Sequence, residues 1–163
     1  MRPKLVERSL ARAQAIRRLL DGKGFTETES HLNEWNYLPG NTWKPIGKGG
    51  SATERERFYR EMSGDAGAAF LLTALLELQD APVDVCNFFH GELGVFGIFN
   101  EQGVPLKVYQ ALRSFQSLVE TPRRVETRGA VPGKLAFGAG LSADGRSATM
   151  LVSNFADSRS DVV

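Results

Sequence analysis

The stretch His-Leu-Asn-Glu-Trp-Asn-Tyr (HLNEWNY), residues 31–37, places one carboxylate, Glu34, among two amides and two aromatic rings. Residues 29–36 are too few for a helix, and a breaker-rich segment, YLPGNTWKPIGKGG, follows them. We therefore predict a strand that opens into a long loop at residues 40–50. Functional side chains concentrate on loops held by a rigid scaffold, so the end of this strand is a candidate site.

The residues before this strand predict an amphipathic helix. Apolar residues recur there at spacings of three and four between basic residues, and Gly22 and Gly24 supply a stop. The apolar positions are Val6, Leu10, Ala13, Ile16 and Leu20. We interpret the Arg-rich remainder of this helix as a solvated face.

A second helix is predicted at residues 65–78, DAGAAFLLTALLEL, which are apolar on nearly every side. Such a helix must be covered on most of its surface. The chain offers few partners for it, so we expect the isolated chain to associate or aggregate. Thr53 and Glu56 match a capping box just upstream.

A second buried strand is predicted at VDVCNFF, residues 83–89, followed by a loop at residues 90–103. Pro105 opens a further helix and Pro122 closes it. The order of strands and helices up to this point is typical of α/β units that build a parallel sheet.

The pattern changes to period two near Arg123. KLAFGAG (residues 134–140) and SATMLVSNF (residues 147–155) flank the pair Asp144-Gly145, which predicts an antiparallel hairpin. The chain is therefore predicted to be α/β, with antiparallel strands at its end.

Composition excludes several classes of partner. The formal charge of +1 gives no field that would attract nucleic acid or an anionic membrane. The N-terminus is charged throughout, and no run approaches the roughly 20 apolar residues of a membrane span. Cys86 is the only cysteine, which we interpret as a small buried residue, and the two histidines, His31 and His90, lie far apart. We therefore expect no disulfide, metal or cofactor. No cellular compartment is predicted from the sequence.

The order and spacing of these motifs, over about residues 3–155, resemble the C-terminal part of a retaining glycoside hydrolase with a (β/α)8 (TIM) barrel. The chain is most similar to the family that contains β-xylosidases and α-L-iduronidases. In that family the seventh strand often ends in Thr-Glu-Trp-Asn, and this chain has Asn33-Glu34-Trp35-Asn36. A second family pattern follows the eighth strand. It is matched here by Gly97-Ile98-Phe99-Asn100, Gly103, Pro105, Lys107 and Tyr109.

The resemblance implies that residues 1–122 are the last units of a catalytic barrel and residues 123–163 the start of an accessory β-sandwich. A whole barrel takes roughly 250 residues, and this chain has 163. We therefore interpret the chain as a fragment. Its expected partners are a glycoside or oligosaccharide substrate, and either the missing N-terminal barrel portion or a second copy.

Glu34 is implied to be the catalytic nucleophile. Retaining hydrolysis uses one carboxylate to attack the anomeric carbon and a second carboxyl, about 5–5.5 Å away, to protonate the leaving oxygen. In the family the second group lies on the fourth strand, which this chain lacks if Glu34 closes the seventh. The chain alone is therefore expected to be inactive.

Eight further residues are predicted to bind substrate. They are Asn33, Trp35, Asn36, Tyr37, Trp43, Phe89, His90 and Glu92. Asn33, Asn36 and Tyr37 are available donors that would keep Glu34 ionised. Trp35 and Trp43 either offer flat faces to sugar rings or are ordinary packing residues.

Residues in and just before the loop after the second strand have alternative interpretations. Phe89 and His90 stand where the family commonly has a tryptophan floor, and Glu92 contacts either sugar or solvent. The alternative to an enzyme fragment is a non-catalytic carbohydrate-binding or interaction module derived from a barrel.

Overall fold

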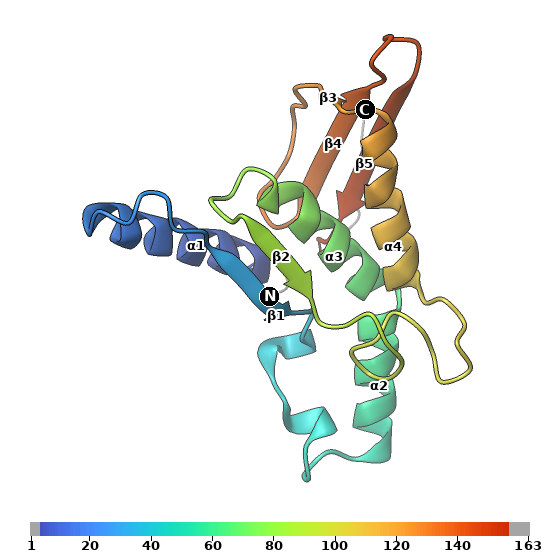
Figure 1. Ribbon diagram of the computed structural model, residues 1–163. Coiled ribbons are helices and arrows are strands. Elements are labelled where there is room, and N and C mark those ends of the chain that lie inside the picture. The colour runs from blue at the N-terminus through green and yellow to red at the C-terminus, as the bar shows by residue number, and fades with distance from the viewer. Residues whose placement is uncertain (1–3, 157–163) are drawn as a thin grey trace.

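The structure is a computed structural model that describes residues 4–156, and it is a mixed α/β fold (Figure 1). Its helices are α1 (Lys4–Gly22), α2 (Ala52–Ser63), α3 (Asp65–Leu78) and α4 (Lys107–Gln116). Its strands are β1 (His31–Trp35), β2 (Val85–Phe88), β3 (Arg123–Arg124), β4 (Leu135–Leu141) and β5 (Ala148–Asn154). Short 3-10 helices are η1 (Pro39–Asn41), η2 (Lys44–Ile46) and η3 (Ser117–Glu120). The predicted α/β class is confirmed.

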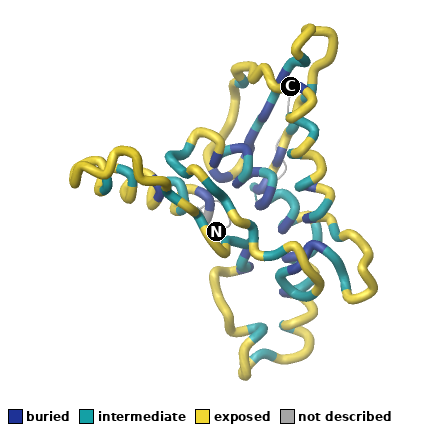
Figure 2. Tube along the Cα trace, viewed as in Figure 1, coloured by how far each residue is buried: buried dark blue, intermediate teal, exposed yellow. Residues whose placement is uncertain are grey.

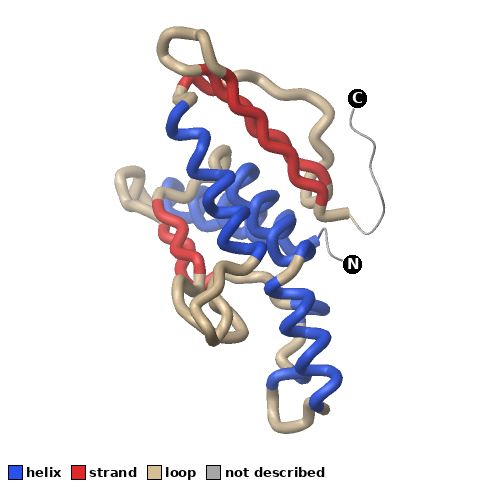
Figure 3. Tube along the Cα trace, turned by 90° about the vertical axis from the view of Figure 1, so that its right-hand side faces the viewer, coloured by secondary structure: helices blue, strands red, loops and turns tan. Residues whose placement is uncertain are grey.

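The helices α3 and α4 lie between two small sheets (Figure 3). On one side β1 and β2 form a two-stranded parallel sheet, joined by the crossover through α2 and α3. On the other side β3, β4 and β5 form an antiparallel sheet in that order. The predicted strands and hairpin are therefore present. Helix α1 reaches away from this body and is largely exposed (Figures 1 and 2).

The β1–β2 pair is covered by helices on one face only. Leu32 and Cys86, which are register partners, pack against the core, whereas the Asn87 side chain donates to Asn33 at 2.6 Å on exposed residues. Strand β2 and Cys86 are consequently half-buried, which corrects the expectation that they would be fully buried. Partial burial raises the pKa of the Cys86 thiol.

Helix α3 is the centre of the core, and every residue of it except Asp65 is buried or half-buried. Phe70 stacks on Tyr37 with ring centroids 5.2 Å apart, and Phe155 meets both rings edge-on at 5.5 Å. On the opposite side Leu71 packs in a second cluster with residues of α4. The expectation that this chain could not cover α3 is therefore wrong, because α1, α2, α4 and the hairpin all pack around it.

The hairpin reaches α3 through small residues. A Cβ atom on Gly138 would lie 2.5 Å from Leu76 Cδ2 of α3, whereas Gly140 approaches the residue after η3, where a Cβ atom would lie 2.0 Å from the Thr121 carbonyl oxygen. The buried Thr73 hydroxyl donates to Ser153 Oγ at 2.9 Å, and Ser153 donates to a carbonyl of α3 at 2.9 Å. This face of the sheet is therefore fitted to the helix at close range.

The capping box of α2 lies two residues upstream of the predicted position. Ser51, in an extended conformation, accepts from the Glu54 backbone N–H at 3.2 Å, and the Glu54 carboxylate accepts from the Ser51 N–H at 2.8 Å. These bonds hold the pKa of Glu54 below its usual range. Thr53 and Glu56 fit the same spacing but fall inside the helix, since the chain enters α2 already at Ala52.

Glu77 of α3 provides a pH-dependent test of this packing. Burial raises the pKa of its carboxyl, the Gly133 N–H that donates to Oε1 at 2.7 Å acts in the opposite direction, and Glu7 adds a smaller upward effect. Its Oε2 is buried and has no partner within residues 4–156. An ionised Glu77 therefore costs folding free energy.

We expect Glu77→Gln to raise the free energy of unfolding at pH 7, because the amide removes the buried charge and keeps an acceptor for Gly133. The wild-type carboxyl becomes neutral as the pH falls through its raised pKa, so the difference should vanish below about pH 4. Urea unfolding at pH 7 and below about pH 4 measures the difference in the free energy of unfolding between the variant and the wild type. The control is Glu126→Gln, because the Glu126 side chain is 76% exposed. Lower stability of Glu77→Gln than of wild type at pH 7 would contradict the burial cost.

Candidate functional site

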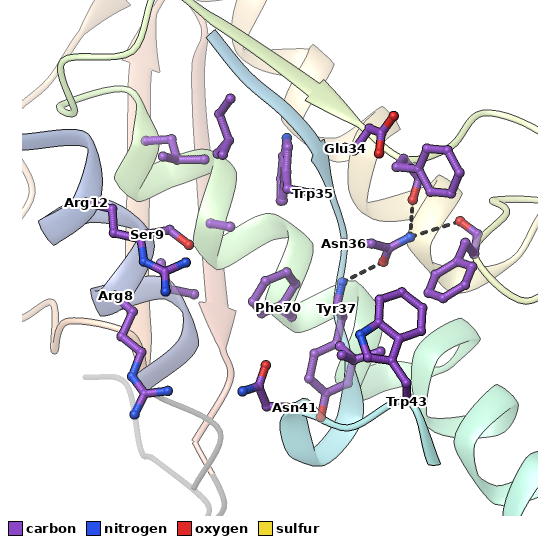
Figure 4. Close-up of a pocket in the computed structure, with 17 residues that line it drawn as sticks. Arg8, Ser9, Arg12, Glu34, Trp35, Asn36, Tyr37, Asn41, Trp43 and Phe70 are labelled. Carbon is purple, nitrogen blue, oxygen red and sulfur yellow. Dashed lines mark hydrogen bonds between the residues drawn. The ribbon is translucent and has the colours of Figure 1, made fainter. Parts of the chain in front are cut away.

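A cavity of about 480 Å³ lies along the end of β1 (Figure 4). It is lined by residues of α1, β1, the segment after β1, α3, and the loop after β2. It brings together six of the nine predicted site residues. These are Glu34, Trp35, Asn36, Tyr37, Trp43 and Phe89. Asn33, His90 and Glu92 do not line it.

Glu34 is the penultimate residue of β1 and is exposed. The β1–β2 register shifts between Leu32 and Trp35, and Glu34 takes a left-handed backbone conformation with φ of 55°. A non-glycine residue in this region costs free energy and is often found at functional sites. The register shift and the positive φ therefore distinguish Glu34 from an ordinary strand residue.

The predicted donors do not reach Glu34. Within residues 4–156 no hydrogen bond to its carboxylate is present; Asn33 accepts from Asn87, and the other two predicted donors bond elsewhere. The reason is that Asn36 and Tyr37 follow the strand and turn toward the loop and the core.

Asn36 connects the segment after β1 to the loop after β2. Its Nδ2 donates to the carbonyl oxygens of Phe89 and, at 2.9 Å, Phe96, while its Oδ1 accepts from the Tyr37 N–H at 2.6 Å. The Phe89 N–H donates to the Trp35 carbonyl at 3.0 Å. Asn36 therefore uses both ends of its amide to fix the backbone around the cavity.

Two of the predicted aromatic residues serve the core. Tyr37 is only 2% exposed and donates its hydroxyl to Glu61 at 2.7 Å. Trp35 is half-buried and packs against Phe70 and Phe88, with ring centroids 6.3 and 5.5 Å away. For Trp35, packing is thus the interpretation that the contacts favour.

Trp43 and Phe89 differ from these core residues because their rings reach solvent. Trp43 is 63% and Phe89 41% exposed. His90, in cis peptide linkage to Phe89, accepts from the Glu92 N–H at its Nδ1 at 3.2 Å. The Glu92 side chain is exposed at the loop surface.

Sequence reasoning missed Phe96 and the polar residues of α1 that line the cavity, namely Arg8, Ser9 and Arg12. Figure 4 shows the α1 residues on the opposite side of β1 from Glu34. Their helical spacing predicts a solvated face, and nothing local indicates that the chain folds back toward β1. Phe96 stands in a Gly-rich loop with no pattern of its own.

The described chain offers neither a metal centre nor a membrane span. Within residues 4–156 no group of three or more His, Cys, Asp or Glu side chains could hold a metal ion. None of the helices in that range is both long and apolar enough to cross a bilayer.

No protein-family model and no curated protein matches this chain. Among solved structures, the chain is similar to a glucosidase from Croceicoccus marinus, determined at 1.8 Å resolution. The two share 25% sequence identity with a TM-score of 0.64, over 90% of this chain and 29% of the glucosidase chain. The likeness suggests a relationship to glycoside hydrolases, and the chain spans less than a third of that enzyme's length.

Proposed function

We propose that this chain is the C-terminal segment of a retaining glycoside hydrolase in which Glu34 is the nucleophile. The observation that carries the proposal is the position of Glu34, exposed at the carboxyl end of a parallel strand and beside a cavity, in a chain that resembles a glucosidase. Active sites of parallel α/β barrels lie at the carboxyl ends of their strands.

In this proposal β1 and β2 are the last two strands of a (β/α)8 barrel. Each strand pairs on one edge only within the described residues, which leaves two edges for further parallel strands. Residues 1–122 then belong to the barrel and residues 123–163 begin an accessory β-sandwich. The missing N-terminal barrel portion is the proposed partner, with self-association as the alternative.

The chemistry is a double displacement. The Glu34 carboxylate attacks the anomeric carbon while an acid outside this chain protonates the departing oxygen, which gives a glycosyl ester and a free alcohol. The same group then removes a proton from water, and the water oxygen displaces Glu34 from the anomeric carbon.

The other predicted site residues differ in how well their positions support contact with a sugar. Trp43 and Phe89 present exposed rings to the cavity. Asn33, His90 and Glu92 lie outside its lining, so their contacts require a substrate that extends past it. The family resemblance favours a xyloside and the structural neighbour a glucoside. These sugars differ by the hydroxymethyl group on C5, so both should be assayed.

Trapping of the intermediate tests the assignment. A protein that contains this chain and the missing strands, incubated with an activated 2-deoxy-2-fluoro glucoside or xyloside, should accumulate a stable glycosyl ester on Glu34. Peptide mapping by mass spectrometry locates it, and Glu92→Gln should leave the label in place. A label on any other carboxylate would displace Glu34 from the role.

A non-catalytic carbohydrate-binding module is the second candidate. The family places the acid/base group on a strand that this chain lacks, and exposed aromatic rings suit binding as well as catalysis. The trapping experiment separates the two candidates, since a binding module forms no ester.

A further inference from the structure

We propose that the groove between α1 and the free edge of β1 is the docking site for a β-strand of the missing barrel portion, one that is apolar along its length and acidic at its carboxyl end. The inference deepens the proposed function and rests on it for the identity of the partner. It gives a partner to a side of α1 whose sequence pattern predicts a solvated face.

The groove continues an existing parallel sheet. Strand β1 pairs with β2 on one edge, and within residues 4–156 no strand pairs with its other edge. Figures 1 and 4 show α1 on the side of β1 away from β2. An unpaired edge presents a row of backbone N–H and C=O groups that a further strand can pair with. No residue of β2 lines the cavity along β1, which favours this edge over the free edge of β2.

The floor of the groove is apolar and belongs to the core. Phe70, Ala74 and Leu78 of α3 line the cavity together with Val6 of α1, and each is at most 6% exposed. The cavity of about 480 Å³ is roughly three times as large as the apolar cavity of about 150 Å³ that admits a benzene molecule. It therefore has room for side chains of an incoming strand, in which alternate residues point to the same face.

Helix α1 has a second face besides the one that packs on α3. Four of its residues recur at spacings of four, four and three, which places them along one side of the helix: Arg8, Arg12, Ile16 and Leu19. Both arginines are exposed and line the cavity, while Ile16 and Leu19 are 50% and 63% exposed. The side of α1 toward the groove is therefore basic near the start of the helix and apolar near its end.

The order of these residues along α1 sets the chemistry of the partner strand. Helix α1 leads through residues 23–30 into the start of β1, and Arg8 in its first turns lines the cavity at the end of β1. A strand parallel to β1 therefore meets the apolar part of α1 with its first residues and the two arginines with its last.

The two arginines have no charged partner in the part of the chain that the structure describes. Within residues 4–156 neither Arg8 nor Arg12 makes an ion pair, whereas Arg17 of the same helix pairs with Asp21 at 2.8 Å. Two like charges four residues apart repel one another. A carboxylate at the end of the docked strand supplies the complementary charge.

Peptide titrations followed by NMR on the 163-residue chain test the groove. The probes, capped at both ends, are Thr-Val-Thr-Val-Thr-Asp-Asp, the same peptide ending in Lys-Lys, and one with the Asp pair moved to its start. We expect the first peptide to shift the backbone amide signals of β1 and of residues 8–19 more than those of β2. The other two should bind about fivefold more weakly, because two ion pairs are lost.

Charge reversal provides the matched variants. Arg8→Glu combined with Arg12→Glu should reverse the preference, so that the Lys-Lys peptide binds better than the Asp-Asp peptide. Arg18→Glu changes an exposed arginine of α1 outside the cavity lining and should leave the preference unchanged. Because all three side chains are exposed, these variants keep the core intact.

The groove would be overturned by absence of binding of the Asp-Asp peptide, by an unchanged preference in the double variant, or by shifts centred on β2. Shifts of the groove signals on dilution of the chain alone would make a second copy the occupant in place of the missing strand. Glu34→Gln should bind the peptide like the wild type. A failed trapping experiment with retained peptide binding would therefore refute the nucleophile and leave the groove standing.

Discussion

Glu34→Ala, introduced into a complete enzyme that contains this chain, should lower the rate of glycoside hydrolysis by several orders of magnitude. Without the carboxylate no glycosyl-enzyme can form, so the first displacement has no attacking group. The fold should persist because the Glu34 side chain is exposed and contributes nothing to the buried core. Initial rates with aryl glucosides and xylosides measure the loss, and circular dichroism checks the fold.

Azide provides the decisive readout for the same variant. A small anion can enter the space vacated by the carboxylate and attack an activated aryl glycoside from the same side, which yields a glycosyl azide of inverted configuration. Loss of an acid/base group would instead yield an azide of retained configuration, because the covalent intermediate still forms. A retained product would thus move Glu34 to the acid/base role, and near-normal rates without azide would leave it outside the chemistry.

The purified 163-residue chain should show negligible hydrolysis of aryl glycosides, and addition of the missing barrel strands should restore turnover. The family resemblance places the partner carboxyl of Glu34 on a strand outside this chain, and an attacking group alone cannot protonate the leaving oxygen. Co-expression of this chain with the N-terminal part of a complete barrel, followed by assay of the complex, measures the gain.

Glu92→Gln is the control for that experiment. Glu92 lies in the loop after β2, exposed and outside the cavity lining, so the variant should not change the activity of the complex by more than a small factor. Turnover by the isolated chain that disappears in Glu92→Gln would show that the acid lies in this loop.

Local patterns were sufficient to predict the main elements. The three- and four-residue spacing predicts α1, the all-apolar run predicts α3 with the bounds observed, and Asp144-Gly145 between alternating strands predicts the β4–β5 hairpin. These signals arise from periodicity and turn chemistry, which a single segment contains in full.

Contacts between distant segments could not be predicted in this way. Tyr37 bonds to Glu61, and Asn36 bonds to carbonyl groups more than 50 positions along the chain. The local sequence makes Asn36 and Tyr37 equally plausible as hydrogen-bond donors to Glu34. Only the tertiary fold directs their side chains to other partners. The covering of α3 escaped prediction for the same reason, since it depends on how closely Gly138 of the hairpin approaches the helix.

The packing of Phe155 on Tyr37 and Phe70 limits how this protein can be divided or recombined. Phe155 directly follows β5, and the ring against which it packs belongs to Tyr37, the residue after Asn36, whose amide holds the cavity backbone. Removing everything beyond residue 122 would open a hole beside the segment that carries Asn36. The final strands therefore support the candidate site. Under the proposed function, a swap of catalytic and accessory parts between related glycoside hydrolases should carry these strands along with the proposed barrel.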